Sequence, residues 1–229
     1  MTVTRTESNV TLHVYEPVAD AVAHALITSG VYLIDFDRPR SEWFQWKSGV
    51  HAPCYCNCRG LIALPQERKV IIDALCEALT LFEKADIISG VATGGIPWAS
   101  WIAQTMDLPF GYVRKEAKGH GTGRLIEGMS VIGQKVVLVD DLIGSGETVE
   151  SAANTVEAER GEVIGIISVV NWNFEKMQTR LSKYRVVCTT SYPHVVNTLQ
   201  LLHKITEEQR LELIEFYKHP QTHVWRSLQ

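Results

Sequence analysis

The sequence has little that is typical of membrane or nucleic-acid-binding proteins. Its longest apolar runs, such as Val136–Val139 and Val163–Val170, end well short of the ~20 residues that cross a bilayer. The first residues, Met1–Asn9, are polar and contain no apolar signal core. The net charge is −4 and the pI is about 6.1, so no overall basic excess would attract nucleic acid. We therefore expect a soluble, cytoplasmic protein whose partners include neither membranes nor nucleic acids.

Cysteine is also scarce, with five residues in a chain of 229. An odd number without a signal peptide argues against a disulfide framework. Cys54, Cys56 and Cys58 alternate along one segment and would share one face of a strand. A zinc site stays open as an alternative, although the second pair of ligands that such sites use is not visible. The simpler interpretation is a buried face of small side chains.

Hydrophobic periodicity predicts that strands and helices alternate over most of the chain. The expected strands are 31–36, 86–91, 110–114, 135–140, 163–170 and 185–189, and the expected helices are 16–29, 65–82, 96–106, 147–159, 174–181, 193–203 and 206–218. An irregular aromatic stretch covers 43–59, and a loop rich in glycine and charge covers 115–128. Strands separated by helices imply right-handed β–α–β units. We expect one α/β domain over 1–229, with an N-terminal appendage at about 1–60 and an open parallel sheet flanked by helices at about 61–229.

The most informative segment is Val136–Thr148, in which an apolar run ends in two carboxylates followed by small residues. Ligands of an open parallel sheet bind beyond the carboxyl ends of its strands, which places Asp140 and Asp141 at a crevice. Gly144 and Gly146 allow a tight turn, and the N–H groups that begin the next helix form a cradle for an anion. A phosphate cradle beside two carboxylates suits a ribose 5-phosphate, because carboxylates accept hydrogen bonds from ring hydroxyls. The spacing fits neither the P-loop nor the dinucleotide fingerprint.

A second segment, Tyr112–Gly128, combines cations with glycines. Its cationic side chains are Arg114, Lys115, Lys118, His120 and Arg124. Such a loop can move and bring positive charge over a polyanion, although a solvated charged hairpin explains it equally well when it is taken alone. Beside a ribose-phosphate site, the cations favour diphosphate as the leaving group, because its developing charge needs positioned donors.

Two further segments add weaker indications. Gly90–Pro97 repeats the order of strand end, glycine turn and helix start, so backbone amides around Thr93 and Gly94 could bind a diphosphate. A tight strand-to-helix turn without a ligand is equally open there. Phe44–Arg59 resembles an aromatic hairpin when it is taken alone, and its Lys47 would then be a surface residue.

Together the four segments resemble the orotate phosphoribosyltransferase family of the type I phosphoribosyltransferases. Val136–Thr148 resembles the motif that binds 5-phosphoribosyl 1-diphosphate (PRPP), Arg114–Gly128 resembles the catalytic loop, and Lys47–Arg59 resembles the N-terminal signature. The resemblance covers nearly the whole chain. It implies transfer of phosphoribose from PRPP to orotate in pyrimidine synthesis, giving orotidine 5′-monophosphate and diphosphate. It also implies an N-terminal hood, and a homodimer whose lid reaches into the partner's site.

The resemblance assigns roles to individual residues. The catalytic residues would be Lys118, His120 and Asp141. The PRPP-binding residues would be Thr93, Gly94, Arg114, Lys115, Lys118, His120, Asp140, Asp141, Leu142, Ile143, Gly144, Ser145, Gly146, Glu147 and Thr148. The base would lie near Lys47 and Gly144. Mg²⁺ is implied as cofactor, held mainly by PRPP and water and not by direct protein ligands.

Two departures from the family pattern concern the base. Many members have Thr or Ser where Gly144 stands, and that hydroxyl helps to bind orotate. Many also have an Asp-Arg pair where Asn171-Trp172-Asn173 stands, and its Arg meets the orotate carboxylate. Both changes leave the PRPP half intact and keep open a phosphoribosyltransferase for another nucleobase. A non-catalytic PRPP-sensing regulator is a further alternative, against which the lid cations Lys118 and His120 argue.

Overall fold

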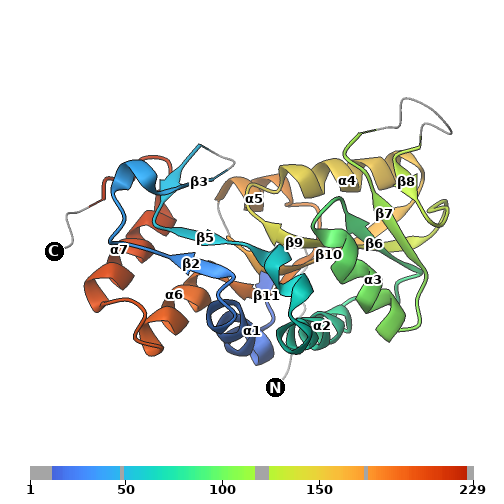
Figure 1. Cartoon of the computed structure of the whole chain (residues 1–229). Coiled ribbons are helices and arrows are strands. Elements are labelled where there is room, and N and C mark those ends of the chain that lie inside the picture. The colour runs from blue at the N-terminus through green and yellow to red at the C-terminus, as the bar shows by residue number, and fades with distance from the viewer. Residues whose placement is uncertain (1–11, 47–48, 117–123, 173–174, 226–229) are drawn as a thin grey trace, which may run out of the picture.

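The computed structural model describes residues 12–46, 49–116, 124–172 and 175–225 (Figure 1). The strands are β1 (Leu12–Val14), β2 (Tyr32–Ile34), β3 (Phe44–Gln45), β4 (His51–Ala52), β5 (Cys54–Cys56), β6 (Ile87–Val91), β7 (Phe110–Val113), β8 (Ile126–Glu127), β9 (Lys135–Ile143), β10 (Glu162–Asn171) and β11 (Val186–Ser191). The α-helices are α1 (Glu16–Thr28), α2 (Pro65–Leu79), α3 (Gly95–Thr105), α4 (Glu147–Ala158), α5 (Glu175–Arg180), α6 (Tyr192–Leu201) and α7 (Glu207–Lys218), and η1 (Arg40–Glu42) and η2 (Cys58–Ala63) are 3₁₀ helices. Within these ranges, no helix has the length and apolar character needed to cross a membrane.

Seven strands form the central sheet in the order β1-β11-β10-β9-β6-β7-β8. All neighbours are parallel except β7 and β8, which are antiparallel. The predicted open parallel sheet flanked by helices is confirmed, with an antiparallel strand added at one edge. Because β6, β9 and β10 are adjacent and parallel, their carboxyl ends meet at one edge of the sheet, and this edge positions the site.

Helices cover both faces of the sheet (Figure 1). α1, α2, α3 and α6 lie on one face, where Leu75 and Ile102 are fully buried. α4 and α5 lie on the other face, around Val156 and Met177. The strand between these layers, Val136–Val139, is buried on both of its sides. This explains why its sequence is an unbroken apolar run and not an alternating pattern.

A hood of short two-stranded ribbons lies beside the sheet. β2 pairs with β5 and β3 pairs with β4, both antiparallel. Aromatic contacts join the hood to the C-terminal part: the rings of Trp43 and Trp225 are 4.9 Å apart, and those of Trp46 and Phe216 are 5.4 Å apart. The C-terminal helix α7, which carries Phe216, therefore supports the hood.

The central sheet differs from the expected strands in three short segments. β1 was not predicted, and β8 lies inside the predicted loop 115–128. Strands of three and two residues are too short to show an alternating pattern. β9 continues past Asp140 to Ile143, because Leu142 and Ile143 pair with Val170 and Asn171 of β10. The two carboxylates therefore lie within the end of the strand and not after it.

The predicted cysteine face is confirmed for two of its three members. Cys54 and Cys56 are buried on β5, and Tyr55 between them is 41% exposed. Cys58 is buried too, but it leaves the strand and begins η2, so the three side chains do not share one strand face. All five thiols are free. Across the described ranges, no three His, Cys, Asp or Glu side chains gather as metal ligands.

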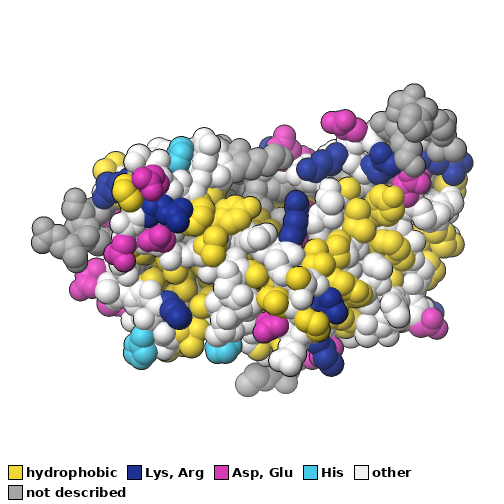
Figure 2. Space-filling model, viewed as in Figure 1, with side chains coloured by type: hydrophobic (Ala, Val, Ile, Leu, Met, Phe, Trp, Pro, Cys, Tyr) yellow, Lys and Arg dark blue, Asp and Glu magenta, His cyan; other side chains and the backbone are white. Residues whose placement is uncertain are grey.

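Apolar side chains also reach the surface. Figure 2 shows apolar side chains gathered over α3 and β7 on the side of the molecule that faces the viewer. Val70 of α2 and Met106 at the end of α3 are 40% and 37% exposed. Phe110 and Tyr112 of β7 are partly exposed, and their rings stack with centroids 6.4 Å apart. Larger apolar patches of this kind are typical of protein–protein interfaces.

Candidate active site

The two carboxylates of β9 lie at the carboxyl edge of the sheet. Asp140 is 7% exposed, and Asp141 beside it is partly exposed. The backbone N–H of Asp141 donates to Asp140 Oδ1 at 2.9 Å, and the N–H of Leu142 donates to Asp141 Oδ1 at 2.9 Å. Burial, and then the charge of Asp141, raises the pKa of Asp140 well above its ordinary value. Two acids crowded at this depth favour a ligand that brings hydroxyl donors or a cation.

The turn after β9 leads directly into the N-terminus of α4. Gly146 has φ of +78°, a left-handed conformation that glycine adopts without strain. α4 begins at the next residue, Glu147, so its first N–H groups lack partners within the helix and face the same edge of the sheet as the carboxylates. Ser145 is exposed at the tip of the turn. The predicted group of Gly144 to Thr148 therefore sits at a helix N-terminus suited to phosphate.

The loop after β6 closes against the carboxylates. A Cβ on Gly94 would lie 2.2 Å from Asp141 Oδ2, and a Cβ on Gly95 would lie 2.0 Å from the carbonyl oxygen of Val139. Glycine is required at both positions because the loop approaches β9 so closely. The structure therefore brings Gly94, one of the residues that the resemblance assigns to PRPP, beside Asp141. α3 begins at Gly95, so a second helix N-terminus opens at this edge.

Arg59 of η2 is a site residue that was absent from the predicted set. Its Nε lies 3.5 Å from Asp141 Oδ2, and its side chain is 59% exposed. η2 packs against β9, which brings the hood and the sheet together at this point. Arg59 ends the N-terminal signature, so the signal for it was its place in that segment.

The segment predicted to act as a lid, 114–128, is described only at its two ends, which we call the lid base. Arg114 follows β7, and its Nη1 lies 3.3 Å from Glu127 Oε1 of β8. The partner of Arg114 in this ion pair is thus a residue of the lid base and not a carboxylate of β9. Lys115 is exposed next to it. Lys47, Lys118 and His120, which were predicted to bind the base or the diphosphate, lie outside the described residues.

Trp172 lies beside Gly144, at the positions where the sequence departs from the family pattern. A Cβ on Gly144 would lie 3.6 Å from Trp172 Cδ1, which is an ordinary contact distance. The backbone N–H of Trp172 donates to the carbonyl oxygen of Ile143 at 3.0 Å. The ring of Trp172 stacks on that of Trp46, with their centroids 5.1 Å apart. Trp172 is 5% exposed. This flank of the site is therefore apolar, and it joins β9, β10 and the hood.

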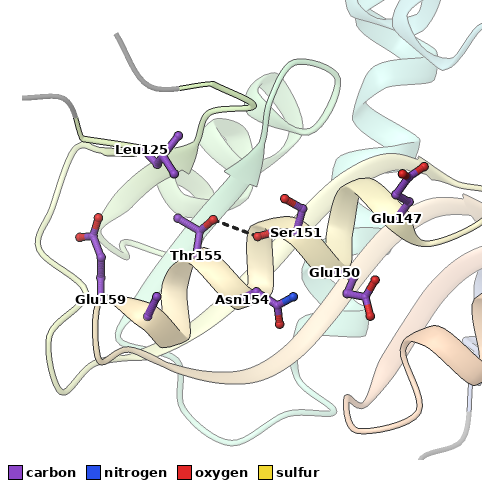
Figure 3. A pocket seen from close by; sticks show the side chains of 8 residues that line it. Leu125, Glu147, Glu150, Ser151, Asn154, Thr155 and Glu159 are labelled. Atoms are coloured by element: carbon purple, nitrogen blue, oxygen red, sulfur yellow. Dashed lines mark hydrogen bonds between the residues drawn. The ribbon is translucent and has the colours of Figure 1, made fainter. Parts of the chain in front are cut away.

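A shallow hollow of about 470 Å³ lies elsewhere, along the outer face of α4 (Figure 3). Leu125 of the lid base faces Ser151 and Thr155, and Thr155 Oγ1 donates to the carbonyl oxygen of Ser151 at 2.9 Å. The acidic side chains in its lining are Glu147, Glu150 and Glu159. Acidic walls repel a diphosphate, and Glu147 is the one predicted site residue among those that line the hollow. We therefore place the active site at the carboxylates of β9.

Comparison with known proteins agrees with this geometry. The phosphoribosyl transferase domain family matches residues 63–204, which is more than half of the chain. The orotate phosphoribosyltransferase of Listeria innocua serovar 6a is 36% identical over 188 residues, which are 81% of this chain and 89% of that protein. The enzyme of the same name from Streptococcus pneumoniae serotype 4 is 34% identical over 205 residues, covering 88% and 95%. The chain belongs to the orotate phosphoribosyltransferase family. It is therefore a pentosyltransferase.

Solved structures of orotate phosphoribosyltransferase relatives share the fold. The Aeropyrum pernix enzyme superposes with a TM-score of 0.65 at 26% identity, over 81% of this chain and 99% of that one. Leishmania donovani UMP synthase superposes with a TM-score of 0.73 at 26% identity, over 86% of this chain and 42% of that longer one. The family match contains both glycine turns and the lid, whereas Arg59 lies before its first residue.

Proposed function

We propose that this enzyme transfers the phosphoribosyl group of PRPP to orotate, with Mg²⁺, giving orotidine 5′-monophosphate and diphosphate in cytoplasmic UMP synthesis. The observation that carries the proposal is the pair Asp140–Asp141 at an edge where α3 and α4 both begin. Two helix N-termini suit the two phosphate-bearing ends of PRPP, and the acids suit the ribose hydroxyls between them. The relatives named orotate phosphoribosyltransferase support orotate as the acceptor.

Each segment would have a separate task in the transfer. Asp140 and Asp141 would accept hydrogen bonds from the ribose, and their charge would favour a cationic ring in the transition state. The Gly144–Thr148 turn would hold the 5-phosphate, and the loop at Thr93 would hold the diphosphate. Lys118 and His120 would neutralise the departing diphosphate. Closure of the lid would exclude water, which would otherwise hydrolyse PRPP.

The residues present are suited to a magnesium ion whose ligands come mainly from PRPP and water. Asp140 and Asp141 offer the carboxylate oxygens that a hard cation prefers. Burial and the charge of Asp141 raise the pKa of Asp140, so a cation bound nearby would favour its ionised form. Two carboxylates are too few for an octahedral shell, so PRPP and water would supply most of the ligands. When bound, Mg²⁺ would offset the negative charge of the diphosphate.

Product formation tests the proposal. We expect the full chain to convert PRPP and orotate into orotidylate and diphosphate when Mg²⁺ is present, as followed by chromatography. Asp141→Asn keeps the shape of the side chain and should lower turnover by about tenfold to a hundredfold, the value of hydrogen bonds to a charged group. Asp73→Asn, on the exposed face of α2, is the matched control. If the wild-type enzyme forms no orotidylate, orotate is not its acceptor.

A second candidate is transfer to another nucleobase. Gly144 provides no hydroxyl, and Trp172 presents an apolar wall where many members have an arginine. A panel of pyrimidines and purines, each incubated with PRPP and Mg²⁺, separates the two candidates. Product from another base and none from orotate would favour the second.

We also propose that the enzyme is a homodimer with shared active sites. Exposed apolar side chains gather over α3 and β7 in Figure 2, and Val70 of the neighbouring helix α2 and Met106 at the end of α3 are exposed too, so this side of the molecule offers a surface that a second copy could cover. The lid starts directly after β7, so a partner seated on this surface would lie close to the lid base.

A further inference from the structure

Two buried thiols touch each other beside the site. Cys56 Sγ and Cys58 Sγ are 3.3 Å apart, and the two residues are 7% and 2% exposed. Asn57 between them has φ −98° and ψ 69°, close to the values of an inverse γ-turn. A turn of this kind draws the residues on its two sides together. The backbone therefore holds the two sulfur atoms in contact.

This thiol pair is coupled to the active-site carboxylates through the chain. Cys58 is followed directly by Arg59, whose Nε lies 3.5 Å from Asp141 Oδ2. The pKa of the Cys58 thiol is raised well above its ordinary value by its hydrogen bond with Cys56, by burial, and by the charges of Asp141 and Asp140. The thiol thus lies within electrostatic reach of both acids. A change at Cys58 is transmitted to Arg59 by one peptide bond.

We propose that Cys56 and Cys58 are a redox pair, and that their oxidation by a peroxide to a disulfide displaces Arg59 from Asp141 and weakens PRPP binding. The effect on PRPP rests on the proposed function, whereas the disulfide itself does not. A disulfide bond is about 2.05 Å long, so the two sulfur atoms must approach by more than an ångström. Because β5 is held in its ribbon by β2, the movement falls on η2 and Arg59.

The chemistry balances with hydrogen peroxide as the oxidant. The Cys56 sulfur, the more exposed of the two, attacks one peroxide oxygen; the O–O bond breaks, and a sulfenic acid and water form. The Cys58 sulfur then attacks the Cys56 sulfur and expels the hydroxyl as a second water. Two thiols lose two hydrogen atoms and two electrons, and one peroxide becomes two waters.

The other thiols provide matched controls. Burial raises the pKa of Cys188 to about 12, and burial first, then the charge of Asp73, raises the pKa of Cys76. Among the described residues, Cys56 and Cys58 are the thiols in contact with each other, whereas the Cys188 thiol donates to the carbonyl oxygen of His13. Cys76→Ser and Cys188→Ser should therefore leave the redox response unchanged, whereas Cys56→Ser and Cys58→Ser should abolish it.

The first measurement is the mass of the full chain after treatment with hydrogen peroxide and removal of the excess. We expect the loss of two hydrogen atoms, a disulfide-linked peptide that contains Cys56 and Cys58, and recovery with dithiothreitol. Neither Cys56→Ser nor Cys58→Ser should show this product. An unchanged wild-type mass, or a disulfide between other cysteines, would overturn the proposal whether or not the enzyme acts on orotate.

The second measurement is PRPP affinity of the oxidised and reduced protein, by calorimetry. We expect oxidation to weaken binding by roughly fivefold, about the effect of one partly exposed ion pair, and Arg59→Gln to remove that difference. Equal affinity in the two states, with the disulfide present, would show that the pair does not regulate the site and would overturn the proposal. If the reduced protein binds no PRPP at all, the proposed function fails instead, and the mass measurement still decides the redox pair.

Discussion

Gly94 and Asp141 are in such close contact that no other residue fits at position 94 without moving the carboxylate. A Cβ there would lie within 2.2 to 2.3 Å of three atoms of the Asp141 carboxyl group. Gly95 is as tightly confined, but by the backbone of β9, since its Cβ would lie 2.0 Å from the carbonyl oxygen of Val139. The two glycines thus restrict different parts of the molecule: a ligand-facing side chain and the frame of the sheet.

Alanine at each glycine should therefore have a different effect. Gly94→Ala should push the Asp141 side chain aside, lowering PRPP affinity by about tenfold or more while reducing the free energy of unfolding by less than about 1.5 kcal/mol. Gly95→Ala should reduce the free energy of unfolding by about 3 kcal/mol, because a backbone atom cannot move away. Urea unfolding and PRPP titration measure the two quantities. Equal losses of stability in both variants would contradict the assigned contacts.

The sequence predicted the parts of this site that depend on local pattern. About a dozen residues of sequence are enough to predict the apolar run before Asp140, the glycines after it and the helix that begins at Glu147. All three lie where they were expected. Arg59 could not be assigned in this way, since its contact with Asp141 depends on the packing of η2 against β9. The same holds for Trp172, whose ring packs against Trp46 of the hood and against Tyr192 of α6.

Asp140 should be needed for activity yet unfavourable for stability. Its folded-state pKa is raised, first by burial and then by Asp141, above the unfolded value of about 3.9. The folded state therefore holds the proton to higher pH, so the free energy of unfolding falls as pH rises from the unfolded pKa to the folded pKa and does not fall further above it. Asp140→Asn should raise the free energy of unfolding at neutral pH while lowering turnover by about tenfold or more.

The pH profile distinguishes this effect from a general gain in packing. The advantage of Asp140→Asn over wild type should shrink as pH falls and vanish below about pH 4, where Asp140 is protonated in both states. Urea unfolding from pH 4 to pH 8 measures it, and the exposed Asp73→Asn serves as the control. A stability difference that does not change with pH would rule out ionisation of Asp140 as the cause.

Shared active sites can be tested by mixing two variants that each have low activity. Lys118→Ala should lower kcat far more than it weakens PRPP binding, because the lid cation would act on the departing diphosphate. If the lid of one subunit serves the carboxylates of the other, mixing Lys118→Ala with Asp141→Asn and exchanging subunits should restore about a quarter of wild-type activity, since half of the dimers then contain one intact site. If mass measurement shows that subunits have exchanged but activity does not recover, the lid and the carboxylates of each site belong to the same chain.

Adding a single hydroxyl at position 144 tests whether orotate binds next to Gly144. A serine Cβ fits there, 3.6 Å from Trp172 Cδ1, and φ at this glycine is not positive. Many family members carry a hydroxyl here that helps to bind orotate, so Gly144→Ser should lower KM for orotate by about threefold, the value of one net hydrogen bond, and leave KM for PRPP unchanged. Gly144→Ala adds the same Cβ without the hydroxyl and separates contact from hydrogen bonding. If serine and alanine change KM for orotate equally, the hydroxyl does not meet the base, and the wall formed by Trp172 and Trp46 becomes the part of the site that selects it.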